Sequence, residues 1–189
     1  MVDVNYILDS LSSGSTLENM LQGDIILIES SADILDRLAP VLLSELVSQK
    51  NAIVLLSGKG YFDFVPLLSS KDVDLSKIFF VDCISRSSGL SLPDNGHVVD
   101  LTSISQLKIV FSSLLDKADS FAGDSFVAFE SLNSLAKLYK SKDFVRFLHI
   151  LLTKLRNKNV GCLLLSVKDD LIEDLRADMV QLFDSVLHF

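Results

Sequence analysis

Short blocks of consecutive apolar residues alternate along the chain with longer segments of helical periodicity. The apolar blocks are Ile25–Glu29, Ile53–Ser57, Ile78–Asp82, Ser125–Glu130 and Gly161–Ser166. Blocks without polar alternation are typical of strands that are covered on both faces. Because helical segments separate these strands, right-handed crossovers would join them into a mainly parallel sheet. The pattern predicts an α/β fold with three α/β/α layers around a central sheet.

Helical periodicity fills the segments between the strands. A helical lead-in is expected over residues 1–22. It contains a short helix at residues 3–13 and a second short helix that begins with a capping box at Ser15–Glu18. Asp33–Lys50 contains Pro40, whose missing amide is expected to kink or restart the helix. Further helices are expected at Phe62–Ser70, Ile104–Lys117, Leu132–Tyr139, Phe144–Asn157 and Lys168–Met179, and short strands at His97–Leu101 and Asp184–Phe189. No linker or internal repeat divides the pattern, which predicts a single domain over residues 1–189.

Composition and charge narrow the classes of function. Apolar residues make up 49% of the chain, but no apolar run approaches the roughly 20 residues that a membrane-spanning helix needs. A net charge of −8 opposes binding to nucleic acid or to an anionic membrane. No basic segment leads into an apolar run at the start, so we expect no secretory signal and a cytoplasmic location. Cys83 and Cys162 lie far apart and are expected to be reduced, buried thiols.

Polar residues follow several of the predicted strands. Open α/β sheets bind ligands beyond the carboxyl ends of their strands. At that edge we expect six candidate ligand-binding residues, namely Ser30, Ser31, Lys59, Arg86, Glu130 and Ser166. The three histidines are scattered, with no carboxylate or cysteine at ligand spacing. The sequence therefore assigns no catalytic residue, no metal site and no cofactor.

Three stretches together resemble the RecA-like ATPase fold, particularly its KaiC-like branch. They are Gly14–Glu29 (GSTLENMLQGDIILIE), Phe126–Leu138 (FVAFESLNSLAKL) and Asp184–Phe189 (DSVLHF). The resemblance implies a RecA-like P-loop NTPase fold. It also implies neighbours that pack side by side, so we expect a protein partner: a second copy in a homo-oligomer, or an active RecA- or KaiC-like relative.

The segment after Glu29 departs from the phosphate loop of that family. The loop follows the pattern Gly-x-x-x-x-Gly-Lys-Ser/Thr, in which glycines let backbone amides wrap the phosphates. Here the segment is SSADILDR, with Asp36 at the lysine position and Arg37 at the hydroxyl position. The Walker A motif is therefore interpreted as degenerate. Gly58-Lys59-Gly60 has neither the preceding glycine nor the following hydroxyl, and it predicts a turn.

Glu130 takes the place of the magnesium-associated aspartate of that family. A residual metal or hydrogen-bonding role is one interpretation, and a solvated or capping acid at the end of a strand is the favoured one. The sequence as a whole favours a non-catalytic RecA- or KaiC-like domain that has lost ATP hydrolysis and acts in protein interaction or regulation. The alternative is a nucleotide- or small-ligand-binding protein, or an enzyme, that uses an altered site at the same edge.

Overall fold

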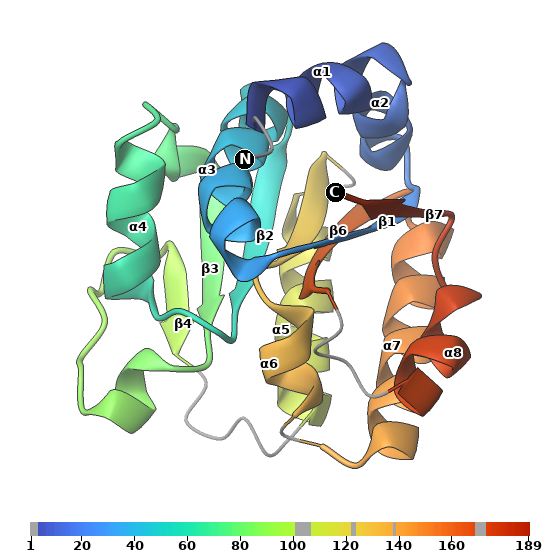
Figure 1. Ribbon diagram of the computed structural model, residues 1–189. Coiled ribbons are helices and arrows are strands. Elements are labelled where there is room, and N and C mark those ends of the chain that lie inside the picture. Colours follow the sequence, from blue (N-terminus) through green and yellow to red (C-terminus); the bar gives the residue numbers. More distant parts are fainter. Residues whose placement is uncertain (1–3, 101–106, 122–123, 138, 169–172) are drawn as a thin grey trace.

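Helices cover both faces of a seven-stranded sheet in the computed structural model (Figure 1). The structure describes residues 4–100, 107–121, 124–137, 139–168 and 173–189. The strands are β1 (Ile25–Ser30), β2 (Asn51–Leu56), β3 (Ile78–Asp82), β4 (Val98–Asp100), β5 (Ser125–Phe129), β6 (Gly161–Val167) and β7 (Ser185–His188). They lie in the order β4-β3-β2-β5-β6-β1-β7, and every neighbouring pair is parallel. The predicted three-layer α/β/α fold is confirmed.

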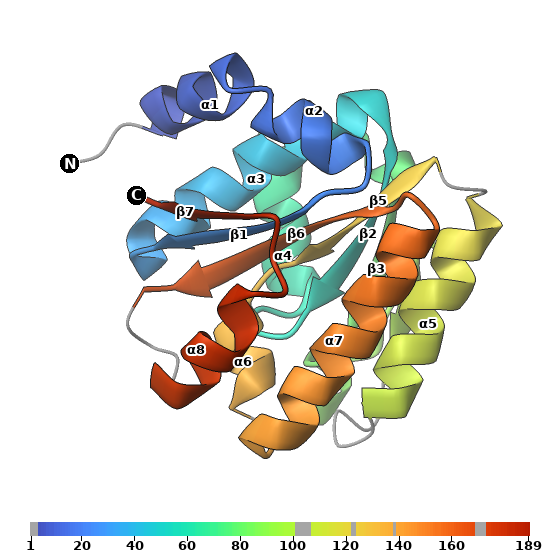
Figure 2. The same cartoon turned by 90° about the vertical axis from the view of Figure 1, so that its right-hand side faces the viewer.

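Two groups of helices form the outer layers (Figure 2). On one face lie α1 (Val4–Ser13), α2 (Thr16–Leu21), α3 (Ala32–Gln49) and α4 (Tyr61–Ser69). On the other lie α5 (Leu107–Ser120), α6 (Leu132–Ala136), α7 (Ser141–Asn157) and α8 (Glu173–Val180). Short 3-10 turns occupy Leu75–Lys77 and Ser85–Ser88. Residues 1–3, 101, 104–106, 138 and 169–172, which belong to predicted elements, lie outside the described residues.

Alternate side chains of each strand enter two separate cores, which explains the apolar blocks of the sequence. Ile26 and Ile28 of β1 pack on the side of α1 to α4, whereas Ile25 and Leu27 pack on the side of α5 to α8. All four side chains are at most 1% exposed. Burial of this kind contributes roughly 1.5–3 kcal/mol for each large aliphatic side chain.

One local prediction about helices is wrong, and a second is wrong in its expectation that the helix could restart at Pro40. Ser15 has a left-handed backbone (φ 56°) and its side chain caps nothing, because a capping box requires an extended residue at that position. α3 continues through Pro40 without interruption. Proline costs about 3 kcal/mol inside a helix. The fully buried Leu38, Leu42 and Leu46 offset that cost, since each contributes roughly 1.5–3 kcal/mol.

Both cysteines are free and buried, as predicted. Burial, together with the negative charges of Asp82 and Asp100, raises the pKa of the Cys83 thiol to about 12. Burial also raises the pKa of Cys162. Both thiols are therefore protonated at neutral pH. Among the described residues, no helix has the length and apolar character needed to cross a bilayer.

Candidate functional site

A single residue joins β1 to α3. β1 ends at Ser30, α3 begins at Ala32, and the intervening Ser31 is exposed and extended (φ −66°, ψ 153°). The side chain of Ser31 makes no capping hydrogen bond. In the first turn of α3, Asp33 forms an ion pair with Arg37 at 2.8 Å. The connection after β1, the second strand from one edge of the sheet, is thus short, contains no glycine and carries an acid on its helical side.

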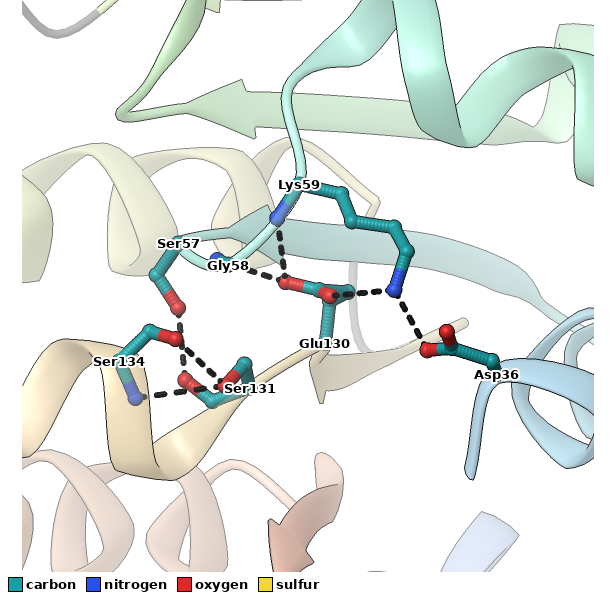
Figure 3. A network of polar contacts seen from close by, with 7 residues as sticks. All are labelled: Asp36, Ser57, Gly58, Lys59, Glu130, Ser131 and Ser134. Atoms are coloured by element: carbon teal, nitrogen blue, oxygen red, sulfur yellow. Dashed lines mark hydrogen bonds and ion pairs between the residues drawn. The ribbon is translucent and has the colours of Figure 1, made fainter. Parts of the chain in front are cut away.

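Glu130 follows β5, and the turn after β2 folds over its carboxylate (Figure 3). Its Oε2 accepts hydrogen bonds from the amides of Gly58 (2.8 Å) and Lys59 (3.2 Å). The side chain is only 6% exposed, so Glu130 is not a solvated acid; its carboxylate instead caps two amides of the turn. Burial raises the pKa of Glu130, although the two amides and the Lys59 charge partly counteract it. The carboxylate holds the β2–α4 turn in place.

The ammonium group of Lys59 lies between two carboxylates. Its Nζ is 2.5 Å from Oδ1 of Asp36 on α3 and 3.9 Å from Oε1 of Glu130 (Figure 3). Lys59 is 31% exposed and Asp36 is 54% exposed. With one cation and two anions, this group of charges is negative overall. The sequence placed Asp36 only at the lysine position of the phosphate-loop pattern and not beside Lys59, because nothing in the pattern shows that α3 faces the β2–α4 turn.

Hydroxyl groups continue the network toward α6. Ser57 Oγ donates to the backbone carbonyl of Ser131 (2.7 Å), and Ser131 Oγ donates to Ser134 Oγ (2.9 Å). Ser131 also caps α6, since its Oγ accepts from the Ser134 amide. The close packing requires glycine at position 58, where a Cβ would lie 2.9 Å from Ser131 Cβ and 3.0 Å from a Glu130 oxygen.

These groups border a hollow of about 240 Å³ beyond the carboxyl ends of the central strands. Its polar wall consists of Asp36, Lys59, Glu130, Ser131 and Ser134. Its apolar wall consists of Ala32, Leu35, Leu165 and Val167. The hollow offers two carboxylates, hydroxyls and one ammonium group that is already paired. Such a set can hold a small polar molecule, but the described residues that line the hollow present no free cation to an anion.

The structure brings two of the six predicted ligand-binding residues, Lys59 and Glu130, into this hollow. Arg86 lines a different hollow of about 400 Å³ near β4. Ser30 donates to the backbone carbonyl at the end of the chain (2.8 Å), and Ser166 is fully buried with no partner for its Oγ among the described residues. Residues at the ends of neighbouring strands therefore point to different faces of the sheet and are buried to different extents.

Two buried acids were not singled out by sequence reasoning. Glu29 of β1 is 1% exposed and lies 2.5 Å from Arg176 and 3.0 Å from His188 Nδ1. Asp82 of β3 is fully buried and accepts hydrogen bonds from three backbone amides and from Ser85 Oγ. An acid at a strand end looks the same in sequence whether it is solvated or enclosed. Across the described part of the chain, no three His, Cys, Asp or Glu side chains are placed to hold a metal ion.

Comparison with known proteins identifies the fold. No protein-family model matches the chain, and no curated protein matches it in sequence. Among solved structures, a KaiC-like protein from the hyperthermophilic archaeon Pyrococcus horikoshii matches with a TM-score of 0.60 and 11% sequence identity. The match covers 88% of this chain and 71% of that one. The chain therefore has the RecA-like α/β/α fold that the sequence resemblance implied. At this level of identity, the likeness shows the fold alone.

Proposed function

We propose that this chain is a non-catalytic RecA- or KaiC-like domain that has lost ATP hydrolysis and acts through protein contacts, in interaction or regulation. The observation that carries this proposal is the one-residue connection between β1 and α3. A phosphate loop needs several residues with free amides, because it must surround the phosphates. Ser31 alone is too short for that task.

The charges around the hollow support the same proposal. Asp36 and Glu130 place two carboxylates there, and the ammonium of Lys59 is already 2.5 Å from Asp36. Two like unit charges 4 Å apart repel by about 4 kcal/mol at an effective dielectric constant of 20. A nucleotide triphosphate carries several negative charges. The site therefore opposes phosphate binding where an active relative would favour it.

Exposed apolar side chains support a function in protein contact. Tyr6 on α1, Leu90 after β3 and Ile150 on α7 are 69%, 48% and 40% exposed. The expected partner is a second copy of this chain or an active RecA- or KaiC-like relative. Single exposed apolar side chains also occur on monomers, so the support comes chiefly from Ile150, which borders an apolar groove with Phe111 and Phe147.

An assay of phosphate release tests the loss of hydrolysis, and sedimentation velocity tests the protein contact. With magnesium ATP, the natural chain and Glu130→Gln should both release phosphate at the rate measured in buffer alone. The chain should sediment as an oligomer, or should do so when mixed with an active relative. Turnover that Glu130→Gln abolishes would overturn the proposal. A strict monomer that binds no partner would contradict its second part.

A second candidate function is the binding of a small polar ligand, or an enzymatic reaction on one, in the same hollow. The observation in its favour is the open volume of about 240 Å³, which charged and hydroxyl groups border. Thermal unfolding with ATP, ADP, GTP and cyclic nucleotides, with and without magnesium, distinguishes the candidates. A ligand that raises the melting temperature of the natural chain, but not of Lys59→Ala or Glu130→Ala, would favour this second function.

A further inference from the structure

An apolar groove lies between α5 and α7, which run side by side on one face of the molecule (Figure 2). Its volume is about 200 Å³, and its lining is Lys108, Phe111, Phe147 and Ile150. The rings of Phe111 and Phe147 meet edge to face, with centroids 6.4 Å apart. Ile150 is 40% exposed. The groove thus presents aromatic and aliphatic surface to the outside.

Basic side chains surround the groove. Lys108 lines it directly, and the ammonium of Lys154 lies 5.1 Å from the centre of the Phe111 ring. Arg146 is exposed and precedes Ile150 by four residues, while Lys154 follows Ile150 by four. Residues four apart share one face of a helix, so both cations flank Ile150. Asp143 lies at the start of the same stripe, which leaves three cations against one carboxylate.

Within the described residues, Lys108, Arg146 and Lys154 form no ion pair with a carboxylate. Six other basic side chains do form such ion pairs, whereas Lys71 and Lys142, like the three rim cations, form none among the described residues; the six are Arg37, Lys59, Arg86, Arg156, Lys158 and Arg176. The chain has a net charge of −8, so a basic rim around an apolar groove is opposite in sign to the net charge of the protein.

We infer that this groove docks an acidic amphipathic helix of a partner protein. Large apolar side chains of that helix would enter between Phe111, Phe147 and Ile150, and its Asp or Glu residues would meet the basic rim. The inference rests on the proposed function in protein contact and names the surface and the partner chemistry. A two-fold contact between copies of this chain through the groove would oppose identical cations, which disfavours a second copy.

Fluorescence anisotropy with a labelled helical peptide tests the inference. The probe carries leucine at successive i, i+3, i+4 and i+7 positions and glutamate on the flanking positions. A control peptide replaces each glutamate with lysine. The natural chain should bind the acidic peptide in preference to the basic one. Affinity for the acidic peptide should fall about tenfold in Arg146→Glu/Lys154→Glu, because two attractive rim charges become repulsive.

Two single variants separate the apolar contribution from a general effect of charge. Ile150→Ala should weaken binding several-fold, because an exposed contact is lost at the centre of the groove. Lys71→Glu changes the same type of charge at an exposed position beside α4, on the other face of the sheet, and should leave binding unchanged. All the substituted side chains are exposed, and circular dichroism of each variant should match the natural chain.

The outcomes separate this inference from the proposed function. No binding of the acidic peptide, or equal binding by all variants, would overturn the inference and leave the proposed function standing. ATP turnover would overturn the proposed function without affecting peptide binding. A dimer that Ile150→Ala dissolves would assign the groove to a second copy and overturn the inference. The natural chain could instead bind anionic vesicles or single-stranded DNA, and Arg146→Glu/Lys154→Glu could abolish that binding. This result would assign the groove to a lipid or nucleic-acid anion and would also overturn the inference.

Discussion

Replacement of Glu130 by alanine tests the structural role of the network. The side chain is 6% exposed, and its Oε2 accepts two backbone hydrogen bonds. A hydrogen bond to a charged group contributes about 1.5–3 kcal/mol. Water in the adjacent hollow can replace part of the lost bonding, and alanine removes the cost of burying a carboxylate. We therefore expect Glu130→Ala to lower the free energy of unfolding by about 2 kcal/mol.

Urea and thermal denaturation followed by circular dichroism measure that loss. For a chain of this size, 1 kcal/mol shifts the melting temperature by about 2–4 °C, so Glu130→Ala should melt roughly 4–8 °C lower. Glu130→Gln is the matched control, since its amide oxygen can still accept from Gly58 and Lys59. It should lose less stability than Glu130→Ala at neutral pH. Equal losses would show that packing, not the acceptor oxygen, carries the effect.

The pH dependence of stability gives a second measure of the same residue. Burial raises the pKa of Glu130 above its ordinary value of 4.5, so the folded state binds this proton more tightly than the unfolded state. Its contribution to stability is present below pH 4.5 and is lost as the pH rises through the folded pKa. Glu130→Gln removes this term. The free energy of unfolding of Glu130→Gln, relative to that of the natural chain, should therefore rise as the pH increases from 4.5 through the folded pKa of Glu130. A difference that does not change with pH would refute the reasoning.

Three further predictions follow from buried contacts. Asp82→Ala removes four hydrogen bonds, including that from Ser85 Oγ, and should lower the free energy of unfolding by about 3 kcal/mol or more in urea denaturation. Gly161→Ala would place a Cβ 1.7 Å from the Met20 carbonyl oxygen, so it should cost at least about 3 kcal/mol or prevent folding, as judged by soluble yield and melting temperature. Cys83, whose thiol pKa is about 12, should react with Ellman's reagent only as fast as the protein unfolds.

The sequence predicts the sheet and its covering helices because their signals are local. Strand β1 is buried on both faces, so Ile25 to Ile28 form an unbroken apolar run that needs no tertiary information to recognise. The continuation of α3 through Pro40 could not be predicted from local signals. The favourable burial that offsets Pro40 comes from the sheet and from other helices, and a local rule for proline does not include it.

The candidate site was predictable only as a set of strand ends. Lys59 and Glu130 lie close together because β2 and β5 are neighbours in the sheet. Hydrophobic periodicity does not predict the order of strands in a sheet. The partnership of Asp36 with Lys59 depends on the packing of α3 in the same way. The groove between Phe111 and Ile150 likewise required the pairing of α5 with α7. The local sequence pattern therefore predicts the helices and strands, whereas the candidate site depends on which of them pack together.

Titration calorimetry of magnesium ATP into the natural chain tests the central claim most directly. That claim is that the β1–α3 junction, with one connecting residue, and the carboxylates of Asp36 and Glu130 provide no site for nucleotide phosphates. The account predicts heats equal to those of dilution. Saturable binding in the micromolar range, weakened by Lys59→Ala, would contradict it.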